Sequence, residues 1–417
     1  MEPVQKKYDV IIVGGGAAGL LAAATAAAGG CRCLLVEKKD RTGRKIMITG
    51  KGRCNITNDC DIDVVFQNIR RNPRFLYSAI YSFNNSDIID FFNSLGVKTK
   101  TERGGRVFPV SDKAADVADA LYEYALSKGV STKTNLNVTS LLIIKGKLAG
   151  VKCGNISFLA DKVIMACGGA SYPATGSDGT GFYLAEKAGH KIIPPKGSLT
   201  GLNTRQTWPR DVMGITLKNV GLKLYKNNKN IFQMQGELLL THFGISGPIV
   251  LTGSASLAGS DYSNTYASID LKPALDIEKL DRRILRDFSE STRKQFSNSL
   301  SNLLPSGLIP IIIKLSGINP DKKINQITQA ERKGLVELLK DLRLDITGAR
   351  PIKEAIVTAG GVDTREINPS TMESKIVKGL YFCGEMIDVD ANTGGFNLTI
   401  AFSTGRLAGK SCAEACQ

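Results

Sequence analysis

The chain has 417 residues, 42% hydrophobic and 22% charged, so it holds enough apolar material for a sizeable core and for two or three domains. This composition excludes intrinsic disorder, collagen-like repeats and a small disulfide-stapled scaffold. The 54 lysines and arginines outnumber the 39 aspartates and glutamates, and the resulting net charge of +15 favours anionic partners. Nine irregularly spaced cysteines indicate thiols in a reducing cytosol rather than a secreted disulfide framework.

The first notable segment is an uncharged run from Val10 to Cys31, which superficially resembles a signal peptide or a membrane span. The run contains six glycines and is otherwise mostly alanine, whereas a spanning helix would be rich in Leu, Ile and Phe. A buried strand, a glycine turn and an alanine-rich helix explain the same residues better. Because no other span or targeting signal follows, we expect a soluble, cytoplasmic protein without a membrane partner.

Residues 8–37 have the order of a dinucleotide-binding βαβ unit. A β-branched run over 8–13 predicts a buried parallel strand, and residues 14–19 then match G-x-G-x-x-G. A helix over about 17–28, a strand over 32–36 and an acid at its end follow in register. The predicted phosphate-loop contacts are Gly14, Gly15, Gly16, Ala17, Ala18 and Gly19, and Glu37 is expected to bond a ribose hydroxyl.

This fingerprint does not separate NAD from FAD, but later segments favour FAD. A glycine- and arginine-rich loop over 43–58 suits wrapping a pyrophosphate and an extended cofactor. Near the other end of the chain, a buried strand ends on Glu385, which can hold ribityl hydroxyls. The glycine-led helix Leu398 to Cys412 can stabilise negative charge on a reduced flavin ring. We therefore predict noncovalent FAD, held by both ends of the chain.

Several blocks of sequence carry a family resemblance. They read GRKIMITGKGRCNITN, GGRVFPVSDKAADV, ACGGASYPATGSDGTGFYLAEKAGH, THFGISGP, and GLYFCGE with NTGGFN. In this order the chain resembles the HI0933-like flavoproteins, which include aminoacetone oxidase-type and 3-dehydro-bile acid reductase-type enzymes. The resemblance implies an α/β fold with a Rossmann-type, two-dinucleotide-binding FAD domain, an inserted β-barrel-like domain and a small helical domain.

Further cofactor contacts follow from this resemblance, and Lys51 stands where the family often has a small residue. Besides the glycine loop and its acid, the expected contacts are Lys38, Arg44, Lys45, Gly50, Gly52, Arg53, Cys54, Asn55, Val138, Gly384, Glu385, Gly395, Asn397 and Leu398. Val138 would meet the adenine through its backbone, from a strand over 135–144.

Three domains are expected from the changes in pattern along the chain. Residues 1–190 and 351–417 form a discontinuous FAD-binding domain, in which Ser86 and Ser111 are expected to cap helices. Residues 191–272 and 345–350 carry short strands and turn signals such as Asn227-Asn228, typical of a barrel-like insert. Residues 273–344 are charged and helical and form the helical insert.

Catalytic residues are less clearly indicated. We expect no metal, because the two histidines lie in different segments and no Cys-x-x-Cys occurs. His242 could protonate a substrate, although a structural role is favoured, and Tyr172 is a second acid candidate that could equally pack against the cofactor. A redox pair of Cys54 with Cys60 is disfavoured, because disulfide-reductase flavoproteins place one residue fewer between their cysteines.

The favoured function, implied by the family's bile-acid-type members, is a reductase that passes hydride from reduced flavin to the β-carbon of a 3-oxo steroid- or bile-acid-like enone. NAD(P)H is the expected transient electron donor, since no second G-x-G-x-x-G offers a separate nicotinamide domain. The partner is expected to be an anionic small molecule. One alternative is an aminoketone oxidase that uses O₂. The other is an FAD-dependent tRNA-modifying enzyme; without an aromatic-basic stripe or RNA-binding motif, we expect no nucleic-acid partner.

Overall fold

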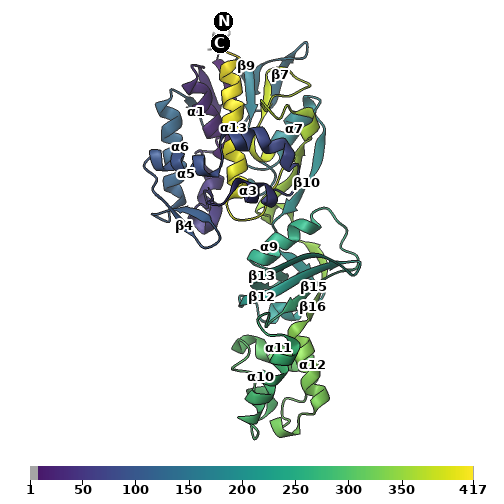
Figure 1. The fold of residues 1–417 in the computed structure, drawn as a ribbon. Coiled ribbons are helices and arrows are strands. Elements are labelled where there is room, and N and C mark those ends of the chain that lie inside the picture. Colours follow the sequence, from purple (N-terminus) through teal and green to yellow (C-terminus); the bar gives the residue numbers. More distant parts are fainter. Residues whose placement is uncertain (1–7, 417) are drawn as a thin grey trace. The chain divides into compact units, whose positions relative to one another are not determined.

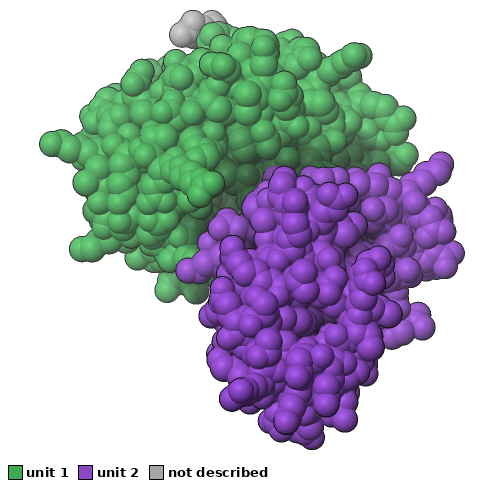
Figure 2. Space-filling view, turned by 60° about the horizontal axis from the view of Figure 1, so that its bottom comes forward, with its two compact units in different colours: residues 1–198, 352–417 green, residues 199–351 purple. Residues whose placement is uncertain are grey.

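The structure, a computed structural model, describes residues 8–416. They fall into two compact units, in which residues 199–351 form the second unit and the remainder forms the first (Figure 2). Strand β10 (Ile192–Ser198) pairs antiparallel with β17 (Val357–Val362) and therefore belongs to the first unit. The predicted boundary after residue 190 is thus several residues too early, because the partner of β10 is a strand more than 150 residues further along the chain, which no local pattern reveals.

The first unit is built around a seven-stranded sheet with parallel central strands. Strand β1 lies between β2 and β9, and β18 pairs with β9. The strands are β1 (Tyr8–Val13), β2 (Cys33–Val36), β6 (Ser131–Lys133), β7 (Ser140–Ile144), β8 (Lys147–Cys153), β9 (Ile156–Met165) and β18 (Leu380–Phe382). Parallel pairing of buried β-branched strands confirms the predicted Rossmann-type α/β fold.

The predicted strand over 135–144 is wrong in its first half. Asn135 adopts φ +54°, and its N–H donates to the carbonyl of Lys39 at 2.9 Å. The N–H of Leu136 donates to the carbonyl of Glu37 at 3.0 Å, so the chain crosses the end of β2 before β7 begins. Val138 therefore lies in a loop, because the preceding residues bond to the segment after β2 instead of forming a strand ladder.

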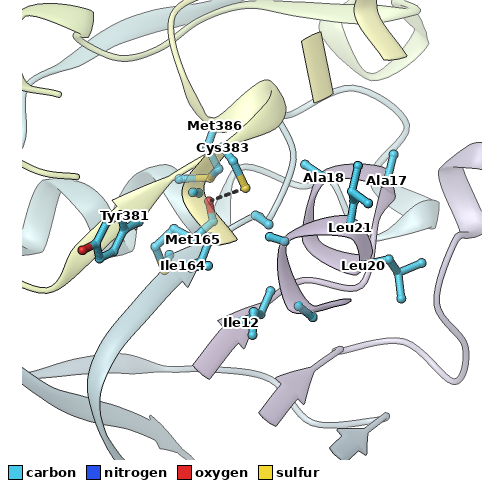
Figure 3. Close-up of a cluster of buried hydrophobic side chains, with 14 of the residues drawn as sticks. Ile12, Ala17, Ala18, Leu20, Leu21, Ile164, Met165, Tyr381, Cys383 and Met386 are labelled. Carbon is cyan, nitrogen blue, oxygen red and sulfur yellow. Dashed lines mark hydrogen bonds between the residues drawn. The ribbon is translucent and has the colours of Figure 1, made fainter. Parts of the chain in front are cut away.

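Two helices, α1 (Ala17–Ala28) and α13 (Phe396–Glu414), lie side by side against the sheet (Figure 1). Ile12 and Ile164 of the sheet and Leu21 of α1 lie in one hydrophobic cluster. The side chains of Ile12 and Ile164 are fully buried, and Leu21 is 2% exposed (Figure 3). In the same cluster the thiol of Cys383 donates a weak hydrogen bond to the carbonyl of Met165. The small alanine side chains of α1 allow this close packing against both neighbours.

The first unit contains further helices and strands. They are α2 (Arg44–Ile48), β3 (Thr57–Asn58), α3 (Ile62–Asn68), α4 (Tyr77–Ser82), α5 (Asn85–Ser94), β4 (Thr99–Glu102), β5 (Arg106–Pro109), α6 (Ala114–Ser127) and α7 (Thr180–Lys187). Asn84, not Ser86, caps α5, because its side chain accepts hydrogen bonds from two N–H groups of the first turn. Helix α6 begins after Lys113 rather than at Ser111.

The second unit contains a closed barrel of six strands. The strands are β11 (Leu202–Thr204), β12 (Thr216–Lys226), β13 (Lys229–Thr241), β14 (Gly244–Ser246), β15 (Thr265–Asp270) and β16 (Leu342–Ala349), with α8 (Trp208–Asp211) and α9 (Pro248–Ser254) beside them. Asn227 and Asn228 both have positive φ and join β12 to β13, as the turn signal predicts.

A helical segment lies between β15 and β16 and consists of α10 (Ile277–Ser289), α11 (Ile309–Ser316) and α12 (Gln329–Lys340). Its core includes Leu280 and Ile284 of α10, which are at most 1% exposed. None of the helices within residues 8–416 combines the length and the hydropathy that a membrane crossing requires.

Candidate cofactor site

The glycine loop between β1 and α1 contains glycines that the fold requires and one that it does not. Gly14 has φ +104°, and a Cβ there would lie 2.5 Å from the carbonyl oxygen of Ala166. A Cβ on Gly19 would collide with the carbonyl oxygen of Gly14. Gly16 has an ordinary φ of −83°, and a Cβ there would meet no atom within 4 Å. The open space beside Gly16 is therefore a cradle that a side chain would fill.

Helix α1 begins beside this cradle without a cap. Gly16 supplies no side-chain hydrogen bond, and the first turn carries no acidic residue. The first N–H groups of the helix are therefore left for an external acceptor, at the positive end of the helix dipole. Ala17 and Ala18 are 9% and 7% exposed, so their N–H groups rather than their side chains are the available contacts. This arrangement suits a diphosphate.

Glu37 lies at the end of β2 against the same loop, as the sequence predicts. Its carboxylate accepts hydrogen bonds from the N–H of Gly15 at 2.7 Å and from the N–H of Lys39 at 2.8 Å. Next to it, the Lys38 ammonium pairs with Asp178 at 2.6 Å. The acid is thus fixed beside the cradle, in a position suited to a ribose.

A second carboxylate, Glu385, is contacted by polar groups from three other segments of the chain. Its Oε2 pairs with the ammonium of Lys45 at 2.6 Å, and its Oε1 accepts from the Ser171 hydroxyl at 3.1 Å. The N–H of Thr358 in β17 donates to Oε1 at 2.7 Å. Gly384, with φ +64°, makes the turn that presents this acid. Ser171 and Thr358 are additions that sequence patterns did not reveal; Ser171 lies inside the conspicuous GGASYP block.

The loop 43–58 meets the start of α13, although more than 300 residues separate them. In the amide orientation that satisfies its partners, Asn55 accepts from the N–H of Gly395 at 3.0 Å. The hydroxyls of Thr57 and Thr399 share a hydrogen bond of 2.7 Å. Gly395 has φ +102°, and a Cβ there would collide with the Thr57 carbonyl. The structure therefore brings together the two segments that the sequence assigned to the flavin.

Several other residues that the sequence predicts to contact the cofactor interact with protein groups at this junction. The guanidinium of Arg53 pairs with Glu102 at 2.8 Å and stacks on the ring of Phe108. Cys54 is fully buried, which raises the pKa of its thiol to about 12, and it forms no disulfide. The amide of Asn397 donates to the Ala391 carbonyl at 2.8 Å. Three further predicted residues present backbone here: Gly50 and Gly52, both with positive φ, and Leu398 in the first turn of α13.

An acidic and basic cluster adjoins the segment before α13. Arg71 lies 3.5 Å from Asp388 and 3.3 Å from Asp390, and burial raises the pKa of both carboxyls. The Ser198 hydroxyl donates to Asp390 at 2.8 Å, and Arg70 donates to Asn392 at 3.0 Å. Arg70 and Arg71 are therefore held by acidic and amide partners that lie more than 300 residues away along the chain.

The two catalytic candidates differ in their surroundings. Tyr172 adopts φ +54° and borders a cavity of about 450 Å³ on the first unit. The other residues that line the cavity are Arg44, Met47, Ile48, Ala174 and Thr175. Arg44 also pairs with Asp40 at 2.8 Å. His242 is an exposed residue of the second unit, in the turn between β13 and β14, with its ring against Phe243.

These residues fit FAD better than an isolated phosphate or an NAD half. The open glycine and the uncapped helix start offer a site for a diphosphate, and Glu37 beside them suits a ribose. Glu385 and the start of α13 add polar groups from the other end of the chain. A cofactor as long as FAD needs such additional groups.

The model of the HI0933-like protein Rossmann domain matches residues 8–411. The chain belongs to the HI0933-like family. A 3-dehydro-bile acid Δ(4,6)-reductase of Clostridium scindens is 32% identical over 383 residues, covering 91% of this chain and 92% of the relative. A ribosomal RNA dihydrouridine synthase of Escherichia coli is 30% identical over 383 residues, covering 90% of each chain.

A solved structure gives the fold comparison. The 3-ketosteroid Δ1-dehydrogenase of Sterolibacterium denitrificans, in complex with 1,4-androstadiene-3,17-dione, superposes with a TM-score of 0.53 at 13% identity, covering 98% of this chain and 100% of that one. At this identity the likeness concerns the fold alone. Family membership and the fitting site together establish the protein as an FAD-dependent oxidoreductase.

Proposed function

We propose that the protein is a reductase of a C=C bond conjugated to a carbonyl. The observation that carries the proposal is the bond change shared by two relatives with dissimilar substrates. A Δ(4,6)-reductase saturates C=C bonds in a 3-oxo steroid nucleus. Dihydrouridine differs from uridine by saturation of C5–C6, which is conjugated to the C4 carbonyl. Both reactions add hydride to the β-carbon and a proton to the α-carbon.

The residues of the first unit would divide this work. The glycine loop and the start of α1 bind the diphosphate, while Glu37 holds the adenosine ribose. Glu385, kept in place by Lys45 and Ser171, orients the ribityl chain. The amino end of α13 favours negative charge on the ring. When bound, reduced FAD supplies the hydride, and NAD(P)H is the proposed source of its electrons.

Tyr172 is the proposed proton donor on the first unit, because it borders the 450 Å³ cavity beside Ser171 and the Glu385 network. Arg44 in the same lining would attract an anionic substrate. His242 remains a second candidate, supported only by its exposure in the THFGISGP turn. A Tyr172→Phe variant that keeps its flavin but loses at least about tenfold in kcat would support the first assignment.

The first candidate substrate is a 3-oxo steroid- or bile-acid-like enone, supported by the relative with 32% identity. The second candidate is a uracil base in RNA, which the net charge of +15 favours, together with the relative of 30% identity. This second candidate runs against the expectation that nucleic acid is not a partner. The two substrates share the reaction, so the protein's chemistry is proposed independently of which one it uses.

Anaerobic stopped-flow spectroscopy tests the proposal. NADH or NADPH should bleach the flavin absorbance, and an enone or unmodified ribosomal RNA transcribed in vitro should restore it. Recovery with the enone identifies the first substrate class, and recovery with RNA containing new dihydrouridine identifies the second. Bleaching by an aminoketone alone, with peroxide formed on admitting O₂, would overturn the reductase in favour of the oxidase.

A further inference from the structure

Four of the nine cysteines gather at the carboxyl ends of α1 and α13. Cys31 follows α1, Cys33 opens β2, Cys412 lies in the last turns of α13, and Cys416 comes two residues after that helix. Cys33 and Cys412 are buried at 2% and 0% exposure, and burial raises the pKa of both thiols. Cys31 is 6% exposed, whereas Cys416 is exposed. Cys416 is therefore the one exposed residue among these four cysteines.

The Sγ atoms of Cys31 and Cys416 lie 2.9 Å apart, closer than two sulfur atoms approach in ordinary packing. The ammonium of Lys162 lies 3.0 Å from the sulfur of Cys416. An accessible sulfur beside a cation and a second thiol is the environment in which cysteines react with oxidants. Both thiols are free in the structure.

Helix packing holds the pair in place. Gly405 and Gly409 of α13 press against the carbonyls of Ala18 and Ala22 in α1, where a Cβ on either glycine would collide. At the end of the pair, a Cβ on Gly29 would collide with the side chain of Ala413. These close contacts fix the position of α13 along the axis of α1. The residues that follow α13 are therefore held next to Cys31.

We propose that Cys31 and Cys416 form a reversible intramolecular disulfide when the protein meets a hydroperoxide. The thiolate of Cys416 attacks the peroxide, the O–O bond breaks, and the sulfur becomes a sulfenic acid. The Cys31 sulfur then displaces water from it and forms the S–S bond. The two thiols are oxidised by two electrons, hydrogen peroxide is reduced to two waters, and an external dithiol reverses the step.

The bond would tie together two positions that lie 385 residues apart along the chain. A crosslink of this span restricts the unfolded chain more than the folded one. The oxidised protein should therefore unfold at a higher temperature than the reduced protein, and α13 should stay on α1 at temperatures where the reduced protein loses its flavin.

The test uses the flavin-loaded protein, treated with hydrogen peroxide and then with a thiol-alkylating reagent. We expect two thiols lost per chain, a crosslinked peptide joining residues 31 and 416, and a rise of several degrees in Tm. Dithiothreitol should reverse all three changes. Cys416→Ser should show none of them, whereas Cys60→Ser, which alters a cysteine of a different segment, should behave like the wild type.

Several outcomes would overturn the proposal. They are an unchanged thiol count, the same loss of two thiols in Cys416→Ser, a crosslink to another cysteine or between chains, and oxidation that dithiothreitol does not reverse. If Cys416→Ser fails to fold, Cys31→Ala provides the same comparison from the other partner.

Discussion

Glycines of the α1–α13 pair serve two opposite purposes. Along the middle of the pair, Gly405 and Gly409 bring two backbones into contact, and any side chain there would strike a carbonyl. At the amino end of α1, Gly16 borders open space and has a backbone conformation that alanine also adopts. The first kind of glycine is needed for the fold, and the second is needed only for what binds beside it.

The largest expected effect comes from placing a side chain inside the helix pair. Gly405→Val should lower the free energy of unfolding by at least about 3 kcal/mol, because the new atoms meet the backbone of α1 rather than a flexible side chain. Chemical denaturation measures the loss. Gly334→Ala in α12, where a Cβ meets nothing within 4 Å, is the matched control. It should gain about 0.5–1 kcal/mol from helix propensity; equal losses in both variants would contradict the distinction.

A smaller effect is expected where the site holds the cofactor by charge. Glu385→Gln should weaken FAD binding by about tenfold, or about 1.4 kcal/mol, because the ion pair with Lys45 disappears while an oxygen remains to accept from Thr358. Titration of the apoprotein with FAD measures the change. Asp281→Asn, which breaks the ion pair with Arg332 in the second unit, should leave FAD affinity unchanged. Wild-type affinity in Glu385→Gln would remove this carboxylate from the site.

The smallest effect concerns His190, a buried group of the first unit. Its Nε2 lies 2.8 Å from the Ser374 hydroxyl and its Nδ1 lies 3.2 Å from Glu366, but burial dominates and lowers the pKa of the imidazole below 6.5. The unfolded chain therefore binds a proton that the folded chain does not, and stability should fall as the pH drops below about 6.5.

Unfolding free energies measured between pH 7.5 and 5 check this sign. The contribution of His190 is at most about 1.4 kcal/mol per pH unit, and His190→Asn should reduce the slope. The same substitution at His242 is the control. A slope unchanged by His190→Asn, or stability that rises as the pH falls over this range, would show that the imidazole is not the group responsible.

The sequence predicted those parts of the site that lie in contiguous residues. The strand, glycine turn, helix, strand and acid of residues 8–37 appear in register, because their hydrophobic pattern and their glycines act locally. The sequence also assigned Asn55 and Gly395 to one cofactor, but it did not predict the hydrogen bond between them. Parts that depend on distant partners were missed or misread. Nothing near Arg71 in the sequence indicates its carboxylate partners, which follow β18, and Thr358 carries no local sign of its bond to Glu385.

The central claim is that the open space beside Gly16 is the cofactor cradle, and Gly16→Val tests it most directly. The apo variant should match apo wild type in circular dichroism and Tm, because the added side chain meets no protein atom within 4 Å of its Cβ. Its affinity for FAD should fall at least about 100-fold, or about 2.7 kcal/mol, because the valine occupies the diphosphate position. A folded variant that binds FAD as tightly as the wild type would contradict the account.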